Sequence, residues 1–217
     1  MPSARSAAPI SYRRRLNSRM SRRRAVFSTL LLLVSLTVSA MAGAGEKAPR
    51  LPNLFGGPFH LTDEQGQEVS PDTYAGKFML VYFGYSYCPD ICPTDLTIMA
   101  AALDSLGESA DRVQPLLISV DPSRDTPEVL REFTDAFHPD IIGLTGREAE
   151  VVAAAKAYRV HRRKFQMEGM SGDDYLVDHS TLTYLMGPDG RFVTMFPRGT
   201  TAEKMTKTLR KYISSGN

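Results

Sequence analysis

The sequence has no tryptophan, two cysteines and four histidines among its 217 residues. A scaffold held together by several disulfides is therefore excluded, because two cysteines form at most one bond within the chain. Structural zinc normally takes four cysteine or histidine ligands, and no local histidine pair completes such a set here. The body of the chain also has no internal repeats and no low-complexity segment. Any chemistry of this protein must therefore depend on few residues.

An excess of positive charge is also missing from the body of the chain. The formal net charge of +2 arises from residues 1–24, a basic N-terminal segment with eight arginines and no acidic residue. The remainder holds 18 basic and 24 acidic side chains, which gives it a net charge of −6. An acidic body offers no electrostatic surface to nucleic acid, so we expect no nucleic-acid partner.

The basic segment precedes a mostly apolar stretch, residues 25–44. A basic region before an apolar run is typical of an export signal or a membrane anchor. The run is long enough to span a bilayer as an anchor. However, Ala40-Met41-Ala42 has the small-x-small pattern of a signal cleavage site. Both outcomes stay open, whereas a lipoprotein anchor is excluded because no cysteine follows the run.

The same N-terminal pattern indicates where the protein resides. The positive-inside rule keeps the arginines in the cytoplasm and places the rest of the chain outside. Ser21-Arg22-Arg23-Arg24 is an imperfect match to a twin-arginine export signal. We therefore expect a bacterial inner-membrane protein that faces the periplasm, or a periplasmic protein after signal cleavage. An arginine-rich, acid-poor start also suits a mitochondrial presequence, and the alternative is the mitochondrial inner membrane, facing the intermembrane space.

Residues 45–53 are expected to form a tether, and residues 54–217 one domain with room for a full core. Continuous apolar runs predict buried strands, and helical periodicity follows most of them. The predicted strands are 59–63 and 67–69 as an N-terminal β-hairpin, then 77–84, 113–120, 141–144, 159–167, 181–186 and 192–196. The predicted helices follow Pro93, Asp125, Thr145 and Thr200, and Asp125 is expected to cap its helix. This order indicates an α/β domain with a partly parallel central sheet.

Both cysteines lie in one loop, Cys88-Pro89-Asp90-Ile91-Cys92-Pro93, between a buried strand and a helix. In open α/β sheets, ligands and chemistry collect at such strand ends. Pro93 must lie in the first helical turn or before it, and Cys92 is expected to be extended because it precedes a proline. Both thiols should then lie at the helix N-terminus, where the helix dipole and free amides favour a thiolate.

A thiolate pair exchanges with disulfides, holds a soft metal or forms an inert disulfide. The inert disulfide is disfavoured, because closing so short a loop would stabilise the fold little. Thioredoxin-type oxidoreductases place two residues between their cysteines and usually a tryptophan before them, whereas this chain has three residues and no tryptophan. Two thiolates together with one imidazole form a ligand set that suits copper.

The candidate for that imidazole is His179. It follows the apolar segment Tyr175-Leu176-Val177 and the carboxylate of Asp178, which could orient or polarise its ring. His161 lies among basic residues, which disfavour a cation there. From spacing alone, a structural histidine at position 179 is the commoner outcome.

Three segments of the chain together resemble the SCO/SenC family of copper proteins. They are residues 84–93, 119–128 and 175–180, and the resemblance covers about residues 50–214. It implies a thioredoxin-like fold, with a central mixed sheet flanked by helices. It also implies that a copper ion, Cu(I) or Cu(II), binds to Cys88, Cys92 and His179, with Asp178 beside the histidine. Asp121, Arg124 and Asp125 belong to the Asp-Pro loop of this family.

The resemblance further implies a membrane-tethered metallochaperone that delivers copper to the dinuclear copper site of cytochrome c oxidase. Its expected partners are the copper-accepting subunit II of the oxidase and an upstream copper donor. The alternative is a thiol-disulfide reductase that keeps the oxidase cysteines reduced, with Cys88 and Cys92 as its redox-active pair. A peroxidase-like or redox-sensing role would need one exposed cysteine of low pKa. Only the chaperone requires His179, and a classical enzyme is not expected.

Overall fold

The structure is a computed structural model that describes residues 54–170 and 174–215. The predicted basic segment, the predicted signal or anchor (25–44) and the predicted tether (45–53) lie outside the described residues. Within the part of the chain that is described, no helix combines the length and the apolar character needed to cross a bilayer.

A five-stranded mixed sheet forms the centre of the domain, with the strand order β5-β4-β3-β8-β9. Its strands are β3 (Phe78–Gly84), β4 (Val113–Ser119), β5 (Ile142–Leu144), β8 (Leu182–Met186) and β9 (Phe192–Pro197). β3, β4 and β5 run parallel, whereas β8 is antiparallel to both β3 and β9. Every residue of β3 is buried, as its unbroken apolar sequence predicts for a strand that is covered on both faces.

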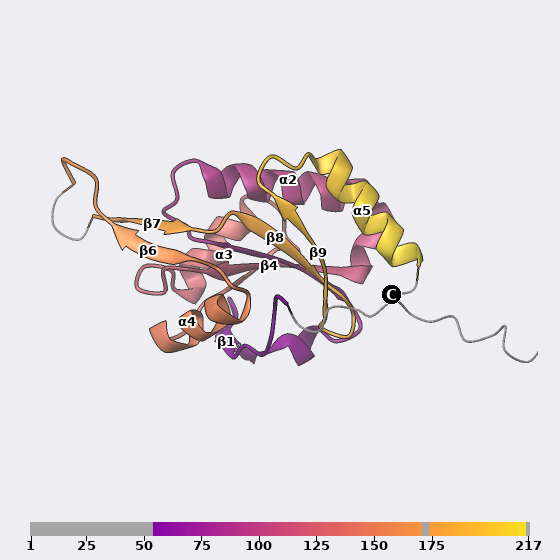
Figure 1. The fold of residues 1–217 in the computed structure, drawn as a ribbon, viewed down its shortest axis with the longest axis horizontal. Coiled ribbons are helices and arrows are strands. Elements are labelled where there is room, and N and C mark those ends of the chain that lie inside the picture. The colour runs from indigo at the N-terminus through magenta and orange to yellow at the C-terminus, as the bar shows by residue number, and fades with distance from the viewer. Residues whose placement is uncertain (1–53, 171–173, 216–217) are drawn as a thin grey trace, which may run out of the picture. The chain divides into compact units, whose positions relative to one another are not determined.

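Helices flank this sheet, which confirms the expected thioredoxin-like architecture (Figure 1). They are α2 (Ile91–Leu106), α3 (Pro127–Asp135), α4 (Glu148–Ala157) and α5 (Ala202–Ser214), with short 3-10 turns η1 (Pro71–Tyr74) and η2 (Gly107–Arg112). α2 and α5 lie side by side, and the Thr206 hydroxyl of α5 donates to the Ala102 carbonyl of α2 at 3.4 Å. α3 packs on β5 so closely that a Cβ at Gly143 would lie 2.6 Å from the Cβ of Leu130.

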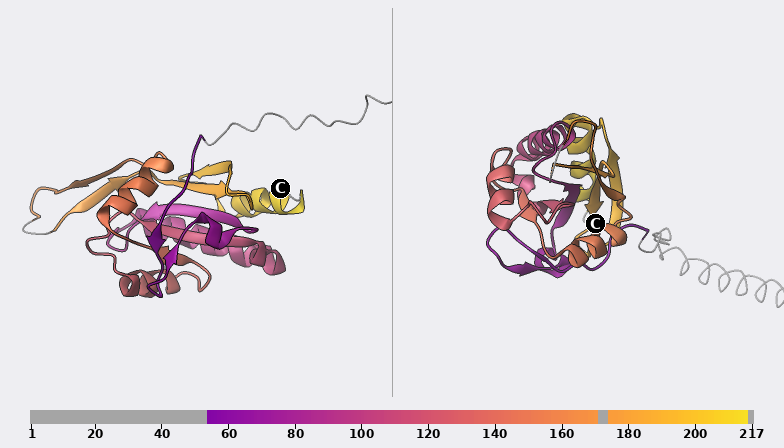
Figure 2. Two further views of the ribbon diagram at one scale, coloured as in Figure 1. Left: turned by 90° about the horizontal axis from the view of Figure 1, so that it is seen from below. Right: turned by 90° about the vertical axis from the view of Figure 1, so that its left-hand side faces the viewer.

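Two antiparallel hairpins lie outside the central sheet. The predicted N-terminal hairpin is present as β1 (Leu61–Thr62) and β2 (Glu68–Val69), with two residues in each strand. β6 (Arg162–Phe165) pairs with β7 (Leu176–His179) in a separate two-stranded sheet. Figures 1 and 2 show this second hairpin projecting from one end of the domain. It carries His179, so its placement decides where the candidate third ligand lies.

The structure corrects two local predictions. Cys92 is not extended, because α2 already begins at Ile91 and includes Cys92 in its first turn. Pro93 is accommodated there because the first amides of a helix have no partner within the helix. Nor does Asp125 cap its helix: Thr126 is the N-cap residue and accepts a hydrogen bond from the Val129 amide. Asp125 is fully buried instead.

Candidate metal centre

The structure brings Cys88, Cys92 and His179 together. The two sulfur atoms and one imidazole nitrogen all lie within 4.8 Å of one another, in an arrangement able to hold a metal ion. The Cys92 Sγ lies 3.6 Å from the His179 Nε2, although 87 residues separate the two in sequence. The Cys92 amide donates to the Cys88 Sγ at 3.3 Å. The helix N-terminus therefore stabilises negative charge on Cys88, as the sequence predicted.

Gly84, the last residue of β3, leaves the space that the Cys92 sulfur occupies. A Cβ at this position would lie 2.8 Å from the Tyr82 Cε1, 3.1 Å from the Cys92 Sγ and 3.2 Å from the Leu117 Cδ1. All three residues are fully buried, so none has free room to move. A side chain at position 84 would therefore displace the Tyr82 ring, the Cys92 sulfur or the Leu117 side chain.

Tyrosine side chains of β3 and the loop after it hold the imidazole. The His179 ring meets the rings of Tyr82 and Tyr85 edge-on, with centroids 6.2 Å and 5.9 Å away. The Tyr82 hydroxyl also donates a hydrogen bond to the Cys92 Sγ at 3.6 Å. We did not predict this role of Tyr82 from the sequence. The sequence could have indicated this role, because a tyrosine in a fully buried strand needs a partner for its hydroxyl.

Asp178 does not contact the imidazole in the way the sequence suggested. The His179 Nδ1 lies 3.1 Å from the Ser180 carbonyl, which occupies the orienting position. The Asp178 carboxylate lies 3.6 Å from the His161 Nε2 instead. Successive residues of a strand point to opposite faces, so Asp178 faces away when His179 faces the cysteines.

The two thiols differ in their protonation. A hydrogen bond from the Cys92 thiol is the largest effect that lowers the pKa of Cys88, to about 4, and it outweighs the effect of burial. His179 and the amides of Cys92 and Asp90 lower the pKa of Cys88 further. The pKa of Cys92 is raised, first by its hydrogen bond to Cys88 and then by burial. The predicted thiolate is therefore Cys88 alone, and Cys92 keeps its proton in the metal-free dithiol.

We predict that alkylation distinguishes the two cysteines. In the reduced metal-free protein, iodoacetamide should modify Cys88 at a rate that stays constant from neutral pH to about pH 5 and falls towards pH 4. Because the folded pKa lies below the unfolded value of 9.0, the thiolate's contribution to stability is complete above pH 9 and is lost as the pH falls through 4. Peptide mapping by mass spectrometry at each pH measures both sites, and a Cys88 midpoint near 9 would contradict the assignment.

Only one of the two sulfurs borders open space. Cys88 lines a cavity of about 230 Å³ together with Ile91 and, from the hairpin, Phe165 and Leu176. Cys92 is completely buried behind it. An incoming ligand or thiol would therefore meet Cys88 first.

Asp125 connects the cysteine loop to the end of β4 through hydrogen bonds. Its carboxylate accepts hydrogen bonds from the amide and the hydroxyl of Ser86 and from the Ser119 hydroxyl at the end of β4. Burial raises the pKa of Asp125, whereas these hydrogen bonds lower it. The residue expected to cap α3 thus fixes the segment that leads into Cys88.

The model of the SCO1/SenC family matches residues 47–214 of this chain. Protein SenC of Rhodobacter capsulatus is 46% identical over 161 residues, which cover 74% of this chain and 72% of that protein. The mitochondrial protein SCO1 of Saccharomyces cerevisiae is 44% identical over 167 residues, which cover 75% of this chain and 56% of that protein. Among solved structures, ScoI of Arabidopsis thaliana with copper bound is 41% identical, with a TM-score of 0.69.

The structural match to Arabidopsis ScoI covers 74% of this chain and 99% of that one. By contrast, this chain spans about half to two thirds of the length of several eukaryotic curated relatives. The family model covers the region that contains both cysteines and His179, and the sequence identities and the fold agree with the same family. The chain therefore belongs to the SCO1/SenC family.

Proposed function

We propose that this protein is a copper metallochaperone that binds one copper ion through Cys88, Cys92 and His179. It would deliver the ion to the dinuclear copper site of cytochrome c oxidase during assembly of the oxidase. The observation that carries the proposal is the convergence of two sulfurs and one imidazole nitrogen within 4.8 Å of one another. The similar Arabidopsis structure holds copper, which supports this choice of metal.

The donor atoms fit copper by their chemistry. Thiolate sulfur is a soft ligand that selects Cu(I), and imidazole suits copper in either oxidation state. A structural zinc site would normally use four protein ligands, whereas the metal-binding group among residues 54–170 and 174–215 contains three. Copper binding should release the Cys92 proton, because a thiol must lose its proton to become a ligand.

The unequal exposure of the cysteines supports delivery by ligand exchange. A thiolate of the acceptor would approach through the cavity beside Cys88 and replace that ligand first. The acceptor's ligands would then replace the remaining two, and Cys92 would take up a proton again. The oxidation state of copper is unchanged in this sequence, so no electron donor or acceptor is required.

We further propose where this delivery takes place. The family includes proteins named as mitochondrial and a bacterial SenC, so both membranes that the N-terminal sequence suggested remain candidates. Residues 25–44 would serve as a membrane anchor or a cleaved signal, with the basic segment on the inner side. The copper-accepting subunit II of the oxidase is the proposed partner, and an upstream donor would supply the ion.

A specific observation also favours the reductase alternative. Cys88 combines a pKa of about 4 with access to a cavity, and Cys92 is a buried thiol beside it. The Cys88 thiolate would attack a disulfide of the oxidase and release one of its sulfurs as a thiolate. Cys92 would then lose its proton and attack the Cys88 sulfur, releasing the second sulfur. Two electrons pass from the cysteine pair to the oxidase disulfide, and His179 supplies no bond.

Copper titration with a His179 variant separates the two functions. We expect the reduced protein to bind one equivalent of Cu(I) tightly in competition with a chelator under nitrogen. His179→Ala should weaken this binding by about tenfold or more, since even partners of ligands often change affinity by 10- to 100-fold. His161→Ala is the matched control, because this exposed histidine lies at the start of the same hairpin and pairs with Asp178.

Equal affinity of the wild type and His179→Ala, or no binding by either protein, would contradict the three-ligand chaperone. In that case a disulfide-reduction assay of the same variants should show activity that depends on Cys88 and Cys92 alone.

A further inference from the structure

Among the residues that the structure describes, no strand pairing joins the hairpin that carries His179 to the central sheet. β7 pairs with β6, and the two form a separate two-stranded sheet. A two-stranded hairpin alone is at best marginally stable in water. Because β7 ends at His179 and β8 begins at Leu182, the chain fixes this end of the hairpin, and the orientation of the hairpin against the domain depends on side-chain contacts as well.

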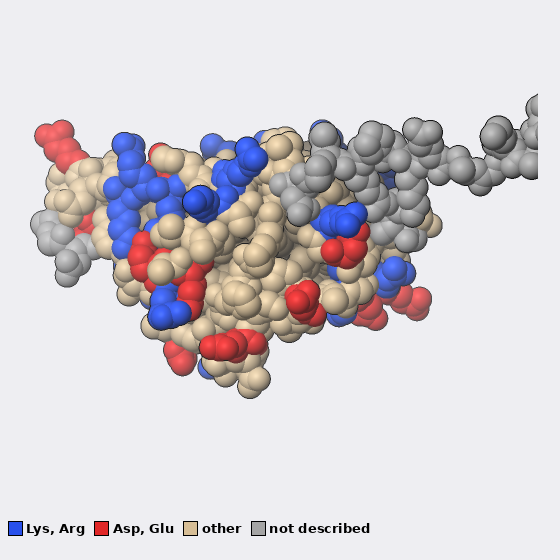
Figure 3. Space-filling model, turned by 60° about the horizontal axis from the view of Figure 1, so that its bottom comes forward, with Lys and Arg blue, Asp and Glu red and all other residues tan. Residues whose placement is uncertain are grey.

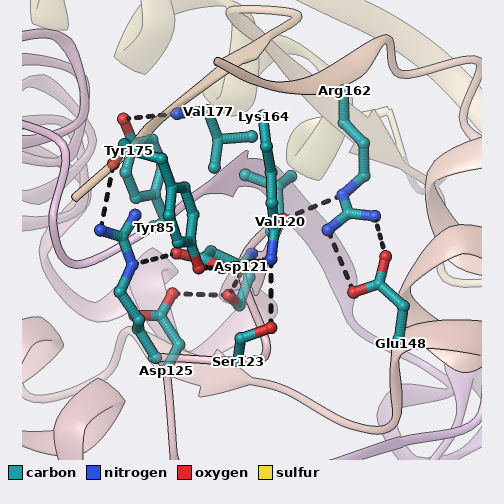
Figure 4. Close-up of polar contacts among 12 residues, drawn as sticks. Tyr85, Val120, Asp121, Ser123, Asp125, Glu148, Arg162, Lys164, Tyr175 and Val177 are labelled. Carbon is teal, nitrogen blue, oxygen red and sulfur yellow. Dashed lines mark hydrogen bonds and ion pairs between the residues drawn. The ribbon is translucent and has the colours of Figure 1, made fainter. Parts of the chain in front are cut away.

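Those contacts converge on Asp121, which lies just after β4 and is fully buried (Figure 4). Its Oδ1 accepts a hydrogen bond from the Tyr175 hydroxyl at 2.7 Å and lies 3.4 Å from the Lys164 Nζ. Its Oδ2 accepts from the Arg124 Nε at 2.5 Å. Lys164 belongs to β6 and Tyr175 directly precedes β7, so one carboxylate contacts both sides of the hairpin.

Arg124 also contacts Tyr175, at its carbonyl and at its ring. Its Nη1 donates to the Tyr175 carbonyl at 3.1 Å, and its guanidinium carbon lies 3.8 Å from the centroid of the Tyr175 ring. Because Asp121 binds the same guanidinium, the carboxylate also fixes the orientation of Arg124. Tyr175 is therefore fixed at its hydroxyl, its ring and its carbonyl.

The pairing of β3 with β4 fixes the position of Asp121 relative to the cysteine loop. β3 and β4 end side by side, with Gly84 paired to Ser119, and the Val120 amide donates to the Gly84 carbonyl at 2.8 Å. The cysteine loop leaves β3 at this same edge of the sheet. A hairpin attached to Asp121 is therefore held against the element that positions Cys88.

Basic side chains of β6 also attach the hairpin to the domain. Lys and Arg side chains gather beside acidic ones at the hairpin end of the domain (Figure 3). Arg162 of β6 donates to the Val120 carbonyl at 2.9 Å and forms an ion pair with Glu148 of α4. Arg162 and Lys164 point to the same face of β6 because they are two residues apart. Their strand partners are His179 and Val177, so the face of the hairpin that meets the domain is the face that presents the imidazole.

We propose that Asp121 is a positioning residue for the metal centre. It holds the hairpin through Tyr175, Lys164 and Arg124, and this attachment directs the His179 imidazole towards the Cys92 sulfur. The inference rests on the proposed copper-binding function. If it is correct, loss of the Asp121 charge should impair copper binding through the third ligand while leaving the two cysteines able to bind.

A double-mutant cycle tests this pathway. Asp121→Asn keeps the shape of the side chain but removes its charge, and it should weaken Cu(I) binding by about tenfold. In the His179→Ala background the same substitution should change the affinity less than about twofold, because coupled residues are not additive. Glu203→Gln, which removes an exposed carboxylate from the first turn of α5, is the matched control and should have no effect in either background.

A second measurement does not involve copper. Hydrogen exchange in the metal-free protein should become about tenfold faster in β6 and β7 of Asp121→Asn, while the amides of β3 keep their protection. If Asp121→Asn does not fold, Tyr175→Phe removes only the hydroxyl that donates to Asp121 and should weaken copper binding about threefold in the wild-type background.

Each outcome bears on one proposal. Failure of the wild type to bind copper overturns the proposed function. Tight wild-type binding that is unaffected by Asp121→Asn and by Tyr175→Phe overturns the role of Asp121. An equal loss in the wild-type and His179→Ala backgrounds, or unchanged exchange of the hairpin amides, overturns it as well.

Discussion

Replacing Cys92 or Cys88 by serine is expected to abolish tight Cu(I) binding. Structural zinc sites with four protein ligands gain about 10–16 kcal/mol, which is roughly 2.5–4 kcal/mol for each ligand. The loss of one thiolate should therefore weaken binding between about a hundredfold and a thousandfold. Serine is a poor substitute, because its hard oxygen is a weak ligand for a soft ion. Both cysteine variants should thus lose more affinity than His179→Ala.

The measurement is the chelator competition used for the histidine variant, with all proteins reduced and their folding checked by circular dichroism. Thr97→Ser is a suitable control, because Thr97 is exposed on the same helix as Cys92. Retention of one tight equivalent by either cysteine variant would show that copper binds elsewhere and would exclude the proposed centre.

Replacing Gly84 by alanine is expected to destabilise the fold and the metal centre together. The added methyl would lie 2.8 Å from the Tyr82 ring and 3.1 Å from the Cys92 sulfur. Overpacking of a well-packed core typically costs about 1–3 kcal/mol of folding free energy. The ring of Tyr82 contacts His179, and its hydroxyl contacts Cys92. Displacement of this ring by the added methyl should therefore also weaken Cu(I) binding, by about tenfold.

Denaturant unfolding and copper competition on the same variant measure the two effects. Gly57→Ala is the matched control, since its Cβ would lie 3.3 Å from the Ala157 Cβ and away from the cysteines. Whatever its effect on stability, it should leave the copper affinity of the folded protein unchanged. If Gly84→Ala has unchanged stability and unchanged copper affinity, the close packing around Cys92 does not constrain the site.

Local sequence patterns were sufficient for most of the fold. The continuous apolar run at β3 predicted a buried parallel strand, and it pairs with β4 in that way. The turn at residues 187–190 predicted the hairpin of β8 and β9. These signals work because burial and turn geometry act on neighbouring residues, which the sequence shows directly.

Two of the predictions that were wrong concerned residues whose role depends on distant partners, whereas the error at Cys92 was local. A capping role for Asp125 fitted its neighbours, but Ser86 and Ser119 surround it in the fold and Thr126 is the cap. Asp178 appeared suited to orient His179, but strand alternation turns it towards His161. Neither arrangement is visible until the loops and the second hairpin are packed on the sheet.

The sequence by itself indicated the candidate ligands, Cys88, Cys92 and His179, and the order of the strands and helices other than β7, which was not among the predicted strands. Only the tertiary structure decided that His179 meets Cys92 across 87 residues, that the Tyr82 hydroxyl donates to the same sulfur, and that the pKa is lowered at Cys88 and raised at Cys92. The physical reason is that ligand geometry and protonation depend on distance, burial and nearby charge. These quantities arise from contacts between segments that are far apart in the chain.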